Sequence, residues 1–359
     1  MNKKKQIAIG NIVLGGMLSV FALILCIYER FIQSSEGVGI TAYRGYFLVV
    51  GILILIVGAL RFPTKKHRAI VQSVFLLPTC LAFVMTIIIP FVLGIFYSLT
   101  DWDGVSVNSF VGFENYKEFF SAPEYIHSFF VTIVFTLINM LLVNFVAFTL
   151  SLMVTTKIKG RNIYRAGFFV PNLIGGIVLG YIWQFIFNYV FTAVGAMIEN
   201  EMLSKSFLIS PNLAVAAVII VSTWQYAGYI MMIYVTAIQG VPEDVVEAAQ
   251  MDGAQGITRL TKIIMPMIAN AFTICLFLTL VNSFKQFDLN YAITVGGPSK
   301  MFMGKAINAT EFLALNIYRT AFTKNDMSIA QAKAVVFFIL LAAVSLIQVA
   351  VNKKKEVEM

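Results

Sequence analysis

Residues 240–266 read GVPEDVVEAAQMDGAQGITRLTKIIMP, a polar segment set between two long apolar runs. Pro242 suits the first turn of a helix, where the backbone N–H that proline lacks would have no partner. Glu243 and Asp244 favour the positive end of that helix dipole, and Gly253 permits the left-handed turn that ends a helix. The segment therefore predicts a short helix that ends near Gly253.

The composition of this helix indicates a surface that contacts another protein. The segment holds four acidic residues against only Arg259 and Lys262. Ala248 and Ala249 keep one face slim, so the helix can lie close to a partner while Glu247 projects. A second helical stretch is predicted over residues 257–266, leading into the next apolar run.

Outward from this segment, most of the chain is apolar. Of its 359 residues, 59% are hydrophobic and 12% are charged, where a soluble domain carries about 25% charged residues. A helix needs about 20 apolar residues to cross the hydrocarbon core of a bilayer, and eight stretches qualify. They cover residues 7–28, 46–62, 70–99, 129–154, 167–190, 213–238, 267–284 and 329–351. The predicted fold is an all-α polytopic membrane protein with about eight transmembrane helices.

The charges predict the orientation of these helices. With both termini on the cytoplasmic side, the inner segments hold 16 Lys and Arg residues and the outer segments hold nine. Cytoplasmic loops carry the excess of Lys and Arg in membrane proteins. The count therefore predicts a cell-membrane protein with cytoplasmic termini, and it explains the net charge of +8 without nucleic acid as a partner.

The sequence carries no recognisable catalytic motif. Gly304 and Lys305 are followed by Ala306, so the G-x-x-x-x-G-K-[ST] loop that cradles nucleotide phosphates is missing. The two histidines are isolated and no His/Cys cluster has metal-ligand spacing. We expect a protein that is not an enzyme and that holds no metal or cofactor of its own.

Residues 240–266 resemble the EAA loop of ABC-importer permeases. That loop reads EAA, three residues, Gly, nine residues and I-x-L-P, and Met265 departs from it where Leu is usual. Asp252 with Ala254 extends the likeness to the DGA form found in carbohydrate permeases. The residues that the resemblance assigns to coupling with an ATPase are Glu247, Ala248, Ala249, Asp252, Gly253, Ile263 and Pro266.

The resemblance extends over about four-fifths of the chain. Residues 110–116, FVGFENY, look like the FxGxxNY segment of sugar permeases related to the maltose permease, and Phe287-Asp288 leading to residues 296–298 looks like their FD...GGP stretch. This likeness implies the ABC type I importer permease fold. Residues 70–359 would form its six-helix core, and residues 1–69 would add two accessory helices.

The same resemblance implies the partners. They are a second permease subunit, two ATPase subunits that bind ATP and Mg²⁺, and an extracytoplasmic solute-binding protein that delivers a sugar. Glu247 would be the main contact with the ATPase, whose motion would rock the spans between inward-facing and outward-facing states.

Polar side chains within two of the spans are candidates for the sugar pathway. They fall where similar permeases line their site, and on each span they share a helical face. They are Ser222, Gln225, Tyr226 and Tyr229 on one span, and Thr279, Ser283 and Gln286 on the next. The alternative is helix–helix packing, since Ser, Thr, Asn and Gln also bond across helices. Asn139 and Asn144 are interpreted as packing contacts, and Lys333 is predicted to snorkel to the outer surface.

Two other functions stay open at this point. One is an ABC permease for a different solute, such as a polyamine, a phosphate or a peptide, because the EAA loop alone does not select the solute. The other is an ion-coupled secondary transporter. That class needs intramembrane carboxylates or broken helices, and no predicted span centre carries an acidic residue.

Overall fold

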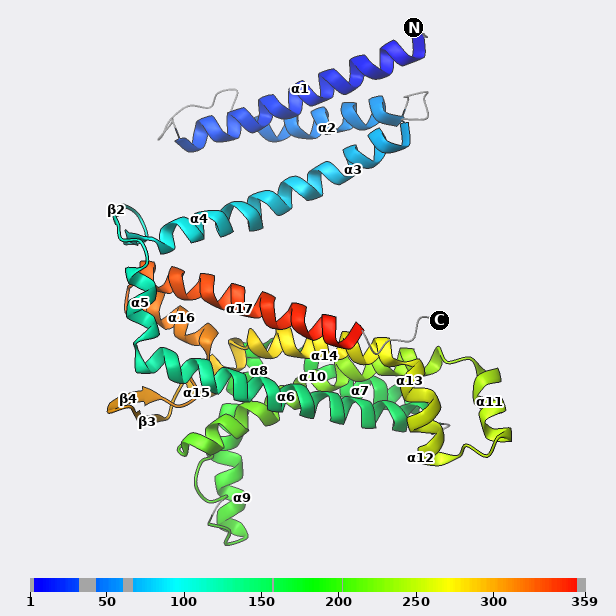
Figure 1. Cartoon of the computed structure of the whole chain (residues 1–359), viewed down its shortest axis with the longest axis vertical. Helices are drawn as coiled ribbons and strands as arrows, with labels where there is room; N and C mark the ends of the chain where they lie inside the picture. Colours follow the sequence, from blue (N-terminus) through cyan, green and yellow to red (C-terminus); the bar gives the residue numbers. More distant parts are fainter. Residues whose placement is uncertain (1–2, 32–42, 61–66, 157, 202, 354–359) are drawn as a thin grey trace. The chain divides into compact units, whose positions relative to one another are not determined.

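The computed structural model describes residues 3–31, 43–60, 67–156, 158–201 and 203–353. The chain divides into two compact units, Met1–Leu93 and Gly94–Met359 (Figure 1). The first unit extends to Leu93 and therefore includes residues 70–93, which the sequence analysis assigns to the six-helix core. The division after residue 69 remains a prediction.

The first unit consists of helices α1 (Lys3–Phe31), α2 (Arg44–Leu60) and α3 (His67–Phe83), a π-helical turn at Val84–Ile88, and the start of α4 (Ile89–Ser98). α1 and α2 approach each other closely. A Cβ added at Gly58 of α2 would lie only 2.8 Å from the backbone N of Ile12 in α1. Small residues allow such close backbone contact between membrane helices.

The second unit holds the longest helix, α6, and both strand pairs. In order, its elements after α4 are β1 (Thr100–Trp102), β2 (Val107–Phe110), α5 (Glu114–Phe120), α6 (Pro123–Thr155), α7 (Arg161–Leu173), α8 (Gly176–Phe185), a π-turn (Ile186–Val190), α9 (Phe191–Met197), α10 (Pro211–Gln239), α11 (Glu243–Met251), α12 (Gly256–Arg259), a π-turn (Leu260–Ile264), α13 (Met265–Met267), α14 (Ala269–Phe284), α15 (Asp288–Thr294), β3 (Ser299–Phe302), β4 (Lys305–Asn308), α16 (Leu313–Phe322) and α17 (Met327–Lys353). β1 pairs with β2 and β3 with β4, both antiparallel.

The core of the second unit lies between α6, α10 and α14. Val143 of α6, Ile230 and Tyr234 of α10 and Cys275 of α14 belong to one buried cluster. α10 is the central span, with 56% of its most apolar stretch buried, whereas α17 is peripheral with 6%. The α11 helix lies at one end of this unit and the β3–β4 hairpin at the opposite end (Figure 1).

Within the described residues, six helices are long and apolar enough to span a membrane, and a seventh span is formed if a bent pair is counted as one. In that pair, Gly256–Met267 and Ala269–Phe284 meet at an angle of 74°. The remaining predicted span corresponds to α2, which is apolar but shorter. The all-α polytopic fold is therefore confirmed, with six or seven full-length spans and the shorter apolar helix α2 among the described residues.

One predicted span has the wrong boundaries. The stretch 167–190 was expected to be continuous, but the helix breaks at Ile174 and Gly175, which are extended. Consecutive glycines at 175 and 176 weaken helix propagation there. The span instead runs from Gly176 to Met197, and α7 is a separate helix that packs against α10.

Candidate functional site

The first helix of the 240–266 segment is α11. Pro242 has an extended conformation and immediately precedes the helix, one residue before the first turn in which the sequence suggested it. Glu243 and Asp244 occupy that first turn, where the positive end of the helix dipole favours carboxylates. The helix start is therefore encoded locally.

The end of α11 is a glycine cap. Gly253 has a φ of +83°, which favours glycine. The N–H of Gly253 donates to Gln250 O at 3.0 Å, and that of Ala254 donates to Ala249 O at 2.8 Å. These two bonds form a Schellman motif, and they confirm the predicted turn at Gly253.

The second helical stretch is present but irregular. It begins at Gly256, continues through the π-turn and ends at Met267, where the 74° bend leads into α14. Ile263 is half-buried and Pro266 is exposed. The α11 helix is thus joined to α10 by a short turn, and to α14 through this second helical stretch.

The surface of α11 is exposed, with a cavity on each side. Glu247, Ala248 and Asp252 are exposed, whereas Ala249 is 8% exposed and faces inward. A cavity of about 910 Å³ is lined by Glu243, Glu247 and Gln250, by Arg259, and by the ends of α6 and α10. A second cavity, of about 450 Å³, lies on the face of Asp244, Ala248 and Asp252, against Ile263. This helix can receive partner side chains on both flanks.

Three of the seven candidate pathway residues lie together. Gln225, Tyr226 and Gln286 line a pocket of about 170 Å³. Gln286 is 5% exposed, and Gln225 Nε2 donates to Ile174 O at 3.2 Å, so the broken helix contributes to this site. The pocket offers amide and phenol groups, which suit the hydroxyls of a sugar.

The other four candidates have different surroundings. Thr279 Oγ1 accepts a hydrogen bond from Asn144 Nδ2 at 2.8 Å, and Ser283 Oγ accepts one from Asn139 Nδ2 at 2.8 Å. Both bonds join α6 to α14, which confirms that Asn139 and Asn144 are packing contacts. Ser222 is buried, and its hydroxyl has no partner among the described residues. Tyr229 packs against the α6–α10–α14 core.

Asn282, Lys285 and Asp288 also line the pocket. Neither Lys285 nor Asp288 was among the candidate pathway residues. Both follow an apolar run, where charged residues normally mark the end of a span. Lys285 and Asp288 line the pocket because α15 packs against α8 in the folded chain, and this contact is not visible in the sequence.

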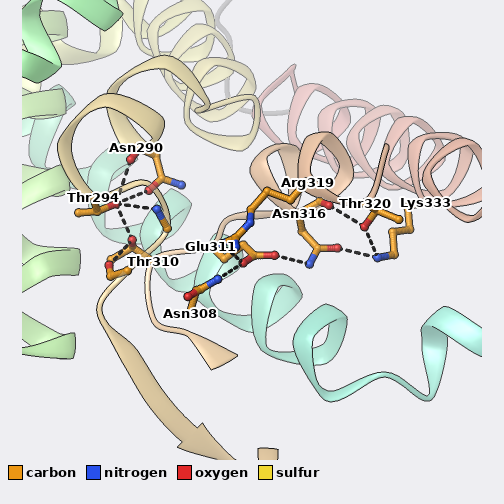
Figure 2. Close-up of polar contacts among 11 residues, drawn as sticks. Asn290, Thr294, Asn308, Thr310, Glu311, Asn316, Arg319, Thr320 and Lys333 are labelled. Carbon is orange, nitrogen blue, oxygen red and sulfur yellow. Dashed lines mark hydrogen bonds and ion pairs between the residues drawn. The ribbon is translucent and has the colours of Figure 1, made fainter. Parts of the chain in front are cut away.

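The position of Lys333 differs from the one predicted. It was expected to snorkel to the surface, but it is 4% exposed. Its Nζ donates to Asn316 Oδ1 at 2.9 Å and to Thr320 Oγ1 at 2.8 Å (Figure 2). Snorkelling requires water within reach of the ammonium group, and α16 covers Lys333 with polar partners instead.

Comparisons with known proteins agree with this architecture. The family model described as "Binding-protein-dependent transport system inner membrane component" matches residues 145–357, more than half of the chain. The probable starch degradation products transport system permease protein AmyD of Thermoanaerobacterium thermosulfurigenes is 40% identical over 285 residues, covering 79% of this chain and 94% of that protein. The multiple sugar-binding transport system permease protein MsmF of Streptococcus mutans is 32% identical, covering 75% and 90% respectively.

A solved structure shares the fold. One chain of a bacterial ABC transporter involved in the import of the acidic polysaccharide alginate aligns with a TM-score of 0.69 and 18% identity, covering 81% of this chain and 97% of that chain. The family model and the two sequence relatives show that the chain belongs to the family of binding-protein-dependent transport system inner membrane components.

Proposed function

We propose that this chain is the membrane-spanning permease subunit of an ATP-driven, binding-protein-dependent sugar importer. Its spans form part of the translocation pathway, and the 240–266 loop couples them to partner ATPases. The observation that carries the proposal is the exposed α11 helix with a cavity on each flank, inside the region that matches the family. The sugar assignment is supported by the names of the two relatives.

The orientation belongs to the same proposal. The excess of Lys and Arg in segments on the side of α11 supports a cytoplasmic location for that helix and for both termini. The ATPases, which bind ATP and Mg²⁺, then act on α11 from the cytoplasm. A second permease subunit completes the pathway, and a solute-binding protein delivers the sugar to the opposite end.

Replacing Glu247 by alanine tests the coupling role. Truncating one partner of a desolvated charge pair costs about 2–5 kcal/mol, so we expect ATP hydrolysis stimulated by the solute-binding protein to fall at least roughly tenfold. The measurement uses the complete transporter in proteoliposomes. Glu201→Ala removes an equal charge from an exposed turn outside the loop and should leave the rate unchanged. A fully active, normally assembled Glu247→Ala transporter would contradict the proposal.

Replacing Gln286 by alanine tests the pocket. Loss of one hydrogen bond to a sugar hydroxyl costs about 1 kcal/mol, so the KM for uptake should rise roughly five- to tenfold while stimulated ATP hydrolysis persists. Thr279→Val is the matched control, because Thr279 bonds to α6 and its loss should change stability rather than KM. Unchanged KM for every sugar, or uptake of polyamine, phosphate or peptide instead, would favour an ABC permease for another solute.

A further inference from the structure

A buried ammonium group lies within the last span. Lys333 has no ion pair among the described residues, and its charge is held by Asn316, Thr320 and the ring of Tyr125, whose centroid is 5.8 Å from Nζ. Ionisable residues inside membrane spans are costly and usually have a role. Neither the α11 helix nor the pocket at Gln286 includes Lys333.

Glu311 supplies the countercharge of Lys333, and the side-chain amide of Asn316 links the two groups. Asn316 accepts from Lys333 and donates through Nδ2 to Glu311 Oε1 at 2.7 Å (Figure 2). Glu311 is 8% exposed, and its other oxygen accepts from Asn308 at 2.6 Å and from Arg319 at 3.0 Å. The carboxylate therefore has three donors, which is the condition under which a buried charge is tolerated.

The α17 helix is held at one end. Its buried residues are Ser328, Ile329, Ala330, Ala332, Lys333 and Val335. From 336 to 351 every residue is half-buried or exposed. The relay from Lys333 to Glu311 thus joins the most deeply buried part of the described helix to α16 and to the base of the β3–β4 hairpin.

We propose that Glu311, Asn316 and Lys333 form an electrostatic anchor that fixes the first two turns of α17 on α16, while the more exposed remainder of the helix shifts during transport. The shift rests on the proposed function, but the anchoring does not. Lys333 is a positioning residue in this proposal, and it does not contact the transported solute.

The test is thiol labelling of Ala330→Cys, a site that is 5% exposed, in a chain whose three native cysteines are replaced by alanine. The complete transporter in nanodiscs is treated with a membrane-impermeant maleimide, with and without ATP. With the anchor intact, we expect slow labelling that ATP does not change. With Lys333→Met, labelling should be roughly tenfold faster, because the packed end opens when a charge-assisted bond is lost.

Lys205→Met is the matched control, because it removes a lysine from an exposed turn before α10 and should leave labelling within about twofold of the parent. If Lys333→Met does not assemble, Thr320→Val removes one of the two acceptors and should give a roughly threefold increase. Unchanged labelling in the Lys333 or Thr320 variants would overturn the anchor. Labelling of the parent that rises with ATP would show that this end of α17 moves, which also overturns it. Because the labelling needs neither sugar nor uptake, its failure is distinguishable from failure of the proposed function.

Discussion

Gly228→Ala is expected to reduce the amount of assembled transporter at least roughly tenfold, because the added Cβ would overlap the backbone carbonyl of Phe168. Overpacking a core costs about 1–3 kcal/mol when side chains can adjust, and here the obstacle is backbone. α7 would have to move away from α10, which would also break the bond from Gln225 to Ile174 O. Yield and thermal unfolding of the detergent-purified complex measure the effect.

Gly167→Ala is the matched control for this prediction. It makes the same substitution on α7 beside Phe168, but its Cβ would meet no atom within 4 Å. In a helix interior alanine is favoured over glycine by about 1 kcal/mol, so this variant should assemble at least as well as the parent. Equal losses in both variants would mean that the α7–α10 contact is not the cause.

The parts of the structure that the sequence predicts well are those with local causes. The start of α11 follows from its acidic first turn, and its end follows from Gly253, whose positive φ needs no distant contact. The apolar runs likewise predict helices, because a backbone in lipid must satisfy its own hydrogen bonds. These features depend on neighbours within a few residues.

The parts that the sequence does not predict depend on distant contacts. The break at Ile174 lies inside an apolar run, and the carbonyl that it frees accepts from Gln225 of another helix. The pocket beside it combines residues from α8, α10, α14 and α15. The prediction for Lys333 was wrong for the same reason, because its partners lie on another helix, α16. Hydropathy alone predicts that a lysine near the end of a span is exposed to water.

Glu311→Leu is expected to lower the free energy of unfolding of the purified chain by about 3–5 kcal/mol, the usual effect of removing one partner from a buried charge network. Asn308, Asn316 and Arg319 would each lose an acceptor, and the buried Lys333 would lose its relayed countercharge. Denaturant titration in detergent measures the change. Glu118→Leu, at an exposed carboxylate of α5, should change stability by less than about 0.5 kcal/mol.

The double variant Glu311→Leu with Lys333→Met decides whether the two charges act on each other through Asn316. If they do, leucine at 311 harms the fold partly by leaving an ammonium group without compensation, and methionine at 333 removes that group while filling similar space. The double variant should then be more stable than the sum of the two single effects predicts, by about 1 kcal/mol or more. Strict additivity would mean that Glu311 stabilises only Asn308, Asn316 and Arg319, and that Asn316, Thr320 and Tyr125 stabilise Lys333 without a contribution from Glu311.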